Sequence, residues 1–135
     1  MSNEFNKVSE FNTTFGHAVR DTPSLRYPDT ALRLAIFEEE ASELRTAFED
    51  NDEVEFLDAL GDVLVTLYGL AQGTGMPIIE AFNIIHESNM SKLGEDGNPV
   101  YFPDGHEKAG KIAKGPNYWT PTEKLKSLLE EKSVR

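Results

Sequence analysis

The chain has 135 residues, of which 39% are hydrophobic and 27% charged, and its formal net charge at pH 7 is −11. A chain of this length can bury a core of its own, so we expect residues 1–135 to form a single domain. The acidic balance argues against nucleic acid or an anionic membrane as a partner. The absence of cysteine excludes disulfides, thiol nucleophiles and cysteine-ligated zinc.

The sequence carries no sign of membrane insertion or secretion. No apolar run approaches the roughly 18 residues that a membrane span needs. The first residues, MSNEFNKVSEF, lack the apolar segment of a signal peptide. We therefore expect a cytoplasmic protein.

Helical spacing of apolar residues predicts four main helices, over residues 2–15, 30–50 and 54–72 and from Pro77 to the region of Lys92. Asn51 and Asp52 form a short turn, so the second and third helices are expected to pack antiparallel. Glycine and proline at turn spacing after Gly94 predict a loop or short hairpin. The predicted fold is all-α: a four-helix bundle, this C-terminal loop and a peripheral last helix.

The third predicted helix is unusually apolar. Between Ala59 and Ala71 the one charged residue is Asp62. A helix that is apolar all round is expected to be buried on both sides. The predicted core stripe of this helix is Phe56, Leu57, Leu60, Val63, Leu64, Leu67 and Ala71. Asp62 would then lie at the boundary of the core and would need a partner.

Acidic residues are concentrated in the second and third helices, where 11 of the chain's 24 lie between Glu38 and Asp62. Those that share inward faces across the antiparallel pair form the predicted cluster: Glu39, Glu40, Glu43, Asp58 and Asp62, with Glu55 one turn before Asp58. Carboxylates held this close repel one another unless cations neutralise them. Oxygen ligands select hard ions, so the sequence predicts Mg²⁺ or Mn²⁺ as the cofactor rather than zinc.

Two other metal sites are excluded by their spacing. An EF-hand loop that began at Asp50 would place Glu55 where glycine is required and Gly61 where the last acidic ligand belongs. A ferritin-like di-iron site needs Glu-x-x-His, which the sequence lacks. A magnesium site for phosphate-ester chemistry needs only clustered carboxylates and basic groups for the phosphates.

Basic residues gather after the fourth helix, at Lys108, Lys111 and Lys114. The apolar stripe of that helix continues into Asn89 and Lys92, with His86 beside it. Polar side chains at the end of a buried stripe suggest the wall of a pocket, although for His86 alone the end of the core is the simpler explanation. A phosphate chain bridged between these lysines and a metal cluster would suit both segments.

These residues resemble a known family. The Glu39, Glu40 and Glu43 pattern (EExxE), the acidic helix ending GDVLVTLYGLA, and the segments SNMSKLGEDG and KGPNY are similar to those of the all-α nucleoside triphosphate pyrophosphohydrolases. This superfamily includes MazG, the dimeric dUTPases and phosphoribosyl-ATP pyrophosphohydrolase. The resemblance runs from Phe11 to about Pro121 and points to the MazG-like, phosphoribosyl-ATP pyrophosphohydrolase-like branch.

The resemblance implies hydrolysis of a nucleoside triphosphate between the α and β phosphates, with Mg²⁺ holding the triphosphate. The residues that match the metal-binding pattern are Glu39, Glu40, Glu43 and Asp62. Glu39 would also activate the water. Those in segments that would contact the nucleotide are Asn89, Lys92, Lys114, Tyr118 and His86. The expected substrate is dUTP or a non-standard dNTP, and the expected assembly is a homodimer or homotetramer.

The chain departs from the family pattern at one point. The second family motif reads ExxD, but Ala59 stands three residues before Asp62. Either Asp58 replaces the missing carboxylate, or Glu55 and Asp58 form the true pair. We take Asp58 and Asp62 as the expected ligands, with Glu55 third.

A second class of function remains open, namely a non-catalytic acidic helical module that binds a partner or mimics nucleic acid. It explains the net charge without a metal. It does not require Asp62 within an apolar helix or a lysine-bearing loop.

Overall fold

The computed structural model describes residues 3–133, and within them the regular secondary structure is helical. The five helices of this part of the chain are α1 (Asn3–Thr14), α2 (Thr30–Glu49), α3 (Glu53–Thr74), α4 (Ile78–Met90) and α5 (Thr122–Ser133). The predicted all-α class is confirmed, with helix boundaries close to those expected. The predicted first residue of the first helix, Ser2, lies outside the described residues.

The chain divides into two compact units, which are described separately. The first contains α1, α2, α3 and the end of α5 from Glu131, and the second extends from Ile79 to Glu130. Among the described helices none is both long enough and apolar enough to span a bilayer.

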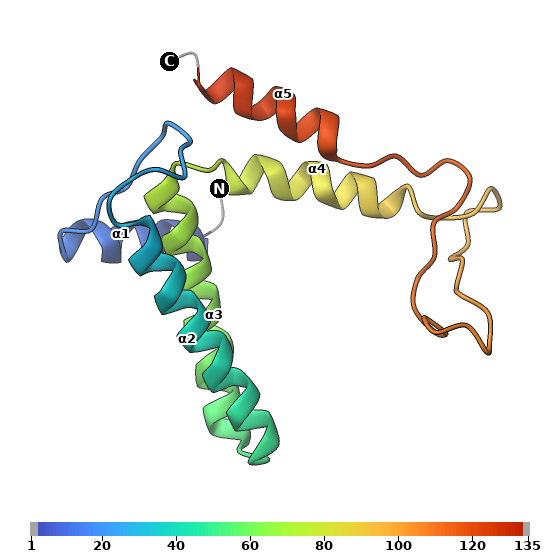
Figure 1. The fold of residues 1–135 in the computed structure, drawn as a ribbon, viewed down its shortest axis with the longest axis horizontal. Helices are drawn as coiled ribbons and strands as arrows, with labels where there is room; N and C mark the ends of the chain where they lie inside the picture. The colour runs from blue at the N-terminus through green and yellow to red at the C-terminus, as the bar shows by residue number, and fades with distance from the viewer. Residues whose placement is uncertain (1–2, 134–135) are drawn as a thin grey trace. The chain divides into compact units, whose positions relative to one another are not determined.

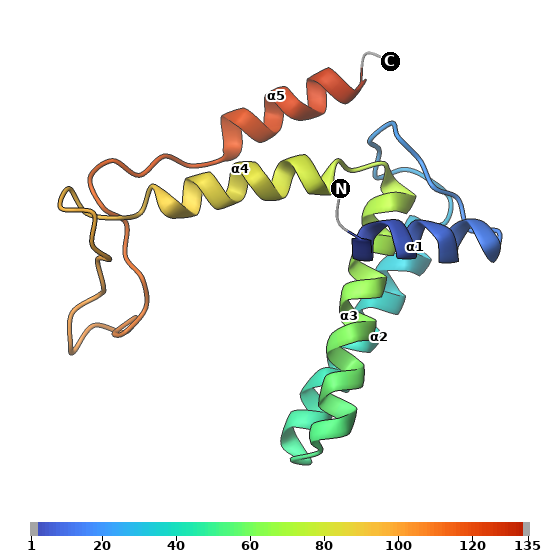
Figure 2. The ribbon, with the colours of Figure 1, turned by 180° about the vertical axis from the view of Figure 1, so that it is seen from behind.

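Helices α2 and α3 form an antiparallel hairpin, visible from both sides in Figures 1 and 2. Asn51 adopts a left-handed conformation (φ 53°), which asparagine tolerates better than most residues. The amides of Asn51 and Asp52 donate to the carbonyls of Phe48 and Ala47, so these two carbonyls near the end of α2 are satisfied. The Asp52 carboxylate then caps α3 by accepting from the amide of Glu55 (3.1 Å). The predicted turn at Asn51 and Asp52 is confirmed.

Helix α1 packs on α3 through aromatic and amide contacts. The rings of Phe5 and Tyr68 meet edge to face, with centroids 5.4 Å apart. Asn12 is buried, and its Nδ2 donates to Oε1 of Gln72 (3.0 Å). These contacts fix the end of α1 beside the last turns of α3.

The segment between α1 and α2 lies against the C-terminal end of α3. The amides of Arg20 and Ser24 donate to the carbonyls of Gln72 and Thr74. Gly75 ends α3 with φ at 68°, and a Cβ at this position would collide with the backbone of Thr22. Glycine is therefore required here on two grounds, its backbone conformation and the closeness of the neighbouring chain.

The expectation that α3 is buried on both sides is wrong for the single chain. Leu57, Leu60, Leu64 and Leu67 are exposed by 71%, 45%, 41% and 39%. Among the described helices of the first unit, α3 packs mainly against α2 and less extensively against α1. The apolar residues that are buried in this unit are small or on α1: Val8, Ala47, Ala59 and Ala71.

The second unit consists of α4 from Ile79, a long loop that returns to it and α5 as far as Glu130. The loop contains an isolated antiparallel bridge between Tyr101 and Ile112, which corresponds to the predicted short hairpin. The buried Ser88 on α4 donates its hydroxyl to the carbonyl of Trp119 (2.8 Å), and the Trp119 amide donates to Ser91 (3.2 Å). These bonds hold the end of the loop against α4.

Candidate active site

The centre of the acidic cluster is Glu40, near the middle of α2. The residue is only half-buried, but its Oε2 atom is buried and has no hydrogen-bond partner among the described residues. A buried carboxylate oxygen without a partner is costly, because it has lost its hydration and gained nothing in return. Such an oxygen requires either a proton or a cation.

The pKa of the Glu40 carboxyl is raised from 4.5 to about 7. The largest cause is burial, which disfavours the charged form. The next is the neighbouring Glu43 carboxyl, one turn further along α2, which favours protonated Glu40 both as a potential hydrogen-bond acceptor and through its negative charge. The charges of Asp62 and Glu39 raise the pKa further. Near neutral pH, Glu40 therefore exists partly in its protonated form.

Asp62 is the residue of α3 whose charge raises the pKa of Glu40, so the hairpin brings one carboxylate of α3 near one of α2. Asp62 is half-buried, whereas Asp58 and Glu55 are exposed. Neither Asp58 nor Glu55 is among the groups that raise the pKa of Glu40 within the described chain. Of the three candidates on α3, Asp62 is thus the one placed at the centre of the cluster.

As their side chains lie in this structure, no three Asp, Glu or His residues in the described part of the chain converge closely enough to hold one metal ion. The cluster nevertheless fits a hard divalent cation. All its donor atoms are carboxylate oxygens, and the unpartnered Oε2 of Glu40 is a ready ligand. Glu39 and Glu43 are exposed and border it on the same helix, so their side chains are free to turn toward a cation.

The predicted nucleotide-contacting residues all lie in the second unit: His86, Asn89, Lys92, Lys114 and Tyr118. Two of them meet, because the Lys114 ammonium lies 4.9 Å from the centre of the Tyr118 ring. The backbone carbonyl of Lys92 accepts a hydrogen bond from the amide of Gly115 (2.8 Å). The backbone at Lys92 therefore lies beside the backbone that follows Lys114. His86 and Asn89 are exposed on α4.

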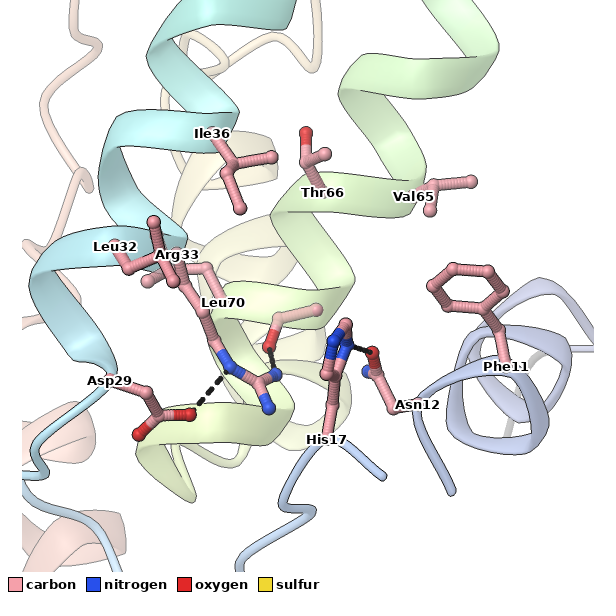
Figure 3. Close-up of a pocket in the computed structure, with 11 residues that line it drawn as sticks. Phe11, Asn12, His17, Asp29, Leu32, Arg33, Ile36, Val65, Thr66 and Leu70 are labelled. Atoms are coloured by element: carbon pink, nitrogen blue, oxygen red, sulfur yellow. Dashed lines mark hydrogen bonds and ion pairs between the residues drawn. The ribbon is translucent and has the colours of Figure 1, made fainter. Parts of the chain in front are cut away.

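The first unit also contains a pocket that the sequence did not reveal, between α1, α2 and α3 (Figure 3). Its lining includes Phe11 and His17, whose rings meet edge to face with centroids 6.2 Å apart. His17 follows the end of α1 by three residues and is exposed. The signal in the sequence that points toward this pocket is the run of aromatic residues at the end of the first helix. That run does not indicate which other helices pack against it.

The fold and the site together define a class of all-α proteins that carry acidic residues on two neighbouring antiparallel helices. The chain belongs to the phosphoribosyl-ATP pyrophosphohydrolase family, whose model matches residues 8–89. The match includes α2, α3 and the whole acidic cluster, and it confirms the resemblance seen in the sequence.

Two individual proteins are similar to the chain. "Uncharacterized protein L479" of Acanthamoeba polyphaga mimivirus is 33% identical over 102 residues, which are 72% of this chain and 38% of that protein. The chain thus spans little more than a third of that relative's length. The crystal structure of a "putative NTP pyrophosphohydrolase" from Exiguobacterium sp. 255-15 is 21% identical, with a TM-score of 0.45, over 98% of this chain and 97% of that one.

Proposed function

We propose that the protein is a nucleoside triphosphate pyrophosphohydrolase. Water would attack the triphosphate and break the bond between the α and β phosphates, giving a nucleoside monophosphate and pyrophosphate. Membership of the phosphoribosyl-ATP pyrophosphohydrolase family supports this reaction type. The single observation that carries the proposal is the unpartnered, buried oxygen of Glu40 amid other carboxylates, because it calls for a cation at this point of the hairpin.

Glu40, Glu43 and Asp62 would hold Mg²⁺ or Mn²⁺ together with Glu39, and Asp58 and Glu55 are further candidates from the exposed side of α3. When bound, the cation would neutralise phosphate charge and stabilise the charge that develops on the leaving pyrophosphate. The raised pKa of Glu40 has a consequence for this role: its carboxyl must lose a proton before it can bind a cation.

We assign to Glu39 the role of activating the attacking water. It lies next to Glu40 in the chain but is exposed, so its carboxylate can orient a water molecule and accept its proton. Lys92 and Lys114 would bind phosphate oxygens by charge, and His86, Asn89 and Tyr118 would contact the rest of the nucleotide. Lys114 lies among the lysines that gather at Lys108, Lys111 and Lys114, and the backbone of Lys92 is hydrogen-bonded to the amide that follows Lys114, which supports a phosphate-binding role for Lys92 and Lys114.

We further propose that the protein works as a homodimer or homotetramer. The support is the row of exposed leucines on α3, which recur at Leu57, Leu60, Leu64 and Leu67 with the spacing of a helix-packing stripe. Large apolar side chains in a continuous row are typical of a surface that another protein covers. A second hairpin of the same kind would complete a four-helix arrangement around this stripe.

The test is pyrophosphate release from a panel of dNTPs and NTPs that includes dUTP and oxidised or methylated dNTPs, with and without Mg²⁺. We expect release only with Mg²⁺ or Mn²⁺, and the fastest turnover for dUTP or a non-standard nucleotide, as a role in cleaning the nucleotide pool requires. Absence of release from every nucleotide would reject the enzyme. It would favour the second class of function, an acidic binding module without catalysis.

A further inference from the structure

The pocket between α1, α2 and α3 has a volume of about 150 Å³. Much of its lining is apolar: Phe11, Leu32, Ile36, Val65 and Leu70. A dry cavity of about this size in another protein accommodates one benzene ring. The pocket therefore has room for a single flat six-membered ring against an apolar wall that includes the aromatic face of Phe11.

A chain of hydrogen bonds determines which polar group the pocket offers. The backbone carbonyl of Phe5 accepts from Nε2 of Gln72 (2.9 Å), so the amide of Gln72 must direct its oxygen toward Asn12. That oxygen accepts from Nδ2 of Asn12 (3.0 Å), which leaves Oδ1 of Asn12 facing His17. Nδ1 of His17 lies 3.4 Å from this oxygen and must donate to it, because the oxygen can only accept.

The tautomer of His17 follows from this chain. In the neutral imidazole one ring nitrogen donates and the other accepts, so a proton on Nδ1 leaves Nε2 as an acceptor. No described residue forms a hydrogen bond with Nε2 of His17. The ring thus presents a fixed acceptor to a ligand (Figure 3).

The other polar residues of the lining are already engaged. Arg33 donates to Asp29 and to the carbonyls of Gly69 and Ala18. The Thr66 hydroxyl donates to main-chain carbonyls of its own helix, one of them that of Asp62 (2.9 Å). Nε2 of His17 is therefore the acceptor atom of these side chains that takes part in no hydrogen bond within the described residues.

The pocket adjoins the acidic cluster along both helices of the hairpin. Ile36, in the lining, lies three and four residues before Glu39 and Glu40, one turn earlier on the same side of α2. On α3, Thr66 in the lining lies one turn after Asp62. One turn is about 5.4 Å, a distance that the ribose between a base and its phosphates can span.

We infer that this pocket receives the base of the nucleotide, and that its size and its fixed acceptor select a pyrimidine with a ring N–H or exocyclic amine directed at His17. The inference rests on the proposed function, because the acidic cluster defines where the phosphates lie. Phe11 would stack on the base, and Nε2 of His17 would accept its hydrogen bond. Selectivity would thus arise from α1 and the segment after it, whereas the metal ligands belong to α2 and α3.

The first experiment compares Phe11→Leu and His17→Phe with the unmodified protein on dUTP, dTTP, dCTP, dATP and dGTP. We expect pyrimidine preference in the unmodified protein. Each variant should lower kcat/KM for the preferred nucleotide about tenfold or more, as the loss of base stacking or of a hydrogen bond does. Mn²⁺ affinity, measured without nucleotide, should stay unchanged. Phe15→Leu is the matched control, because Phe15 contacts Phe11 (4.7 Å between ring centroids) but does not line the pocket.

The second experiment is independent of turnover. Deoxyuridine, thymidine, deoxycytidine and deoxyadenosine are titrated without metal into the ¹⁵N-labelled full chain, and amide shifts are recorded. Pyrimidine nucleosides should change the amide chemical shifts of Asn12, His17, Gly69 and Leu70. In Phe11→Leu these changes should be abolished.

The outcomes separate the two proposals. If nucleotides are hydrolysed but Phe11→Leu and His17→Phe leave the base preference intact, the base pocket is rejected and the enzyme stands. A preference for purines overturns the assignment to pyrimidines. If no nucleotide is hydrolysed, the enzyme is rejected, and the nucleoside shifts alone decide whether the pocket binds a single-ring base.

Discussion

Arg33 and Asp29 form an ion pair across the first turn of α2, with Nε of Arg33 2.9 Å from Oδ2 of Asp29. The Arg33 side chain is only 11% exposed. Its two other nitrogens donate to the carbonyls of Gly69 and Ala18, each at 2.7 Å. One guanidinium thus connects α2 with α3 and with the segment after α1, all three of which border the pocket.

Replacing Arg33 by alanine should therefore lower the free energy of unfolding by about 3 kcal/mol, because Asp29 and two carbonyls lose their shared donor. Urea denaturation measures the change. Arg45→Ala is the control, since Arg45 forms an exposed pair with Glu49 at 3.6 Å and otherwise lies over the exposed ring of Phe48. Its loss should cost less than about 1 kcal/mol. Equal losses in the two variants would contradict the role given to Arg33.

Gly73 on α3 should not tolerate a side chain. A Cβ at this position would lie 2.6 Å from Cδ of Arg33, whose hydrogen bonds prevent it from moving aside. We expect Gly73→Ala to lower the free energy of unfolding by about 1–3 kcal/mol, despite the better helix propensity of alanine. In Gly61→Ala, on the same helix, the added Cβ meets no atom within 4 Å. This control should be neutral or stabilised by up to about 1 kcal/mol. In thermal melts Gly73→Ala should lower the Tm, whereas Gly61→Ala should leave it unchanged or raise it.

The raised pKa of Glu40 predicts a pH dependence of stability without added metal. Between the ordinary value of 4.5 and about 7, the folded protein holds a proton on Glu40 that the unfolded chain has lost. This contribution to stability is complete below pH 4.5 and is lost as the pH rises through 7. The Tm of the unmodified protein should therefore fall more steeply over this interval than that of Glu40→Gln.

Glu38→Gln serves as the control for charge alone, because Glu38 is exposed. Glu38→Gln should keep the steep fall of Tm with rising pH. Adding Mg²⁺ at pH 7.5 should raise the Tm of the unmodified protein and of Glu38→Gln by mass action, but not that of Glu40→Gln. A slope in Glu40→Gln as steep as in the unmodified protein would show that other groups cause the pH dependence.

The three acidic candidates on α3 should differ in their effect on turnover. Asp62→Asn and Glu43→Gln should each abolish pyrophosphate release while the helical circular dichroism signal is retained. Asp58→Asn and Glu55→Gln should reduce it less, because their side chains are exposed and do not act on Glu40. Mn²⁺ binding followed by electron paramagnetic resonance should decline in the same order. Full activity of both Asp62→Asn and Glu43→Gln would show that the cation site is wrongly placed.

The exposed leucines of α3 predict an oligomer in solution. Light scattering at micromolar concentration should give the mass of a dimer or tetramer, and Leu60→Glu should convert it to a monomer, because a charge in an apolar interface is left without a partner. Leu25→Glu is the matched control: Leu25 is also exposed but lies in the segment before α2. A monomeric unmodified protein would reject this assembly.

The sequence by itself determined the helices, their order and the turn of the hairpin, because these depend on local signals. Helical spacing marked each element, and Asn51 and Asp52 marked the turn through their own backbone and capping preferences. The proximity of an α3 carboxylate to the α2 glutamates, seen for Asp62 and Glu40, followed from the same information, since a short turn admits only antiparallel packing.

The tertiary structure decided which side chains act together. In the sequence Asp62 stands out, yet the most perturbed carboxyl is that of Glu40, because burial and three neighbouring charges combine there. Because Ala59 lacks the carboxylate of the family motif, the sequence leaves open which acidic residue of α3 faces Glu40. A one-residue shift on a helix rotates a side chain by about 100°, so only the structure distinguishes the candidates. The pocket depends on where the segment between α1 and α2 places His17, which no local pattern encodes. The exposure of Leu57 and its neighbours likewise reflects how much of α3 the rest of the chain covers, and an apolar pattern states only that something must cover it.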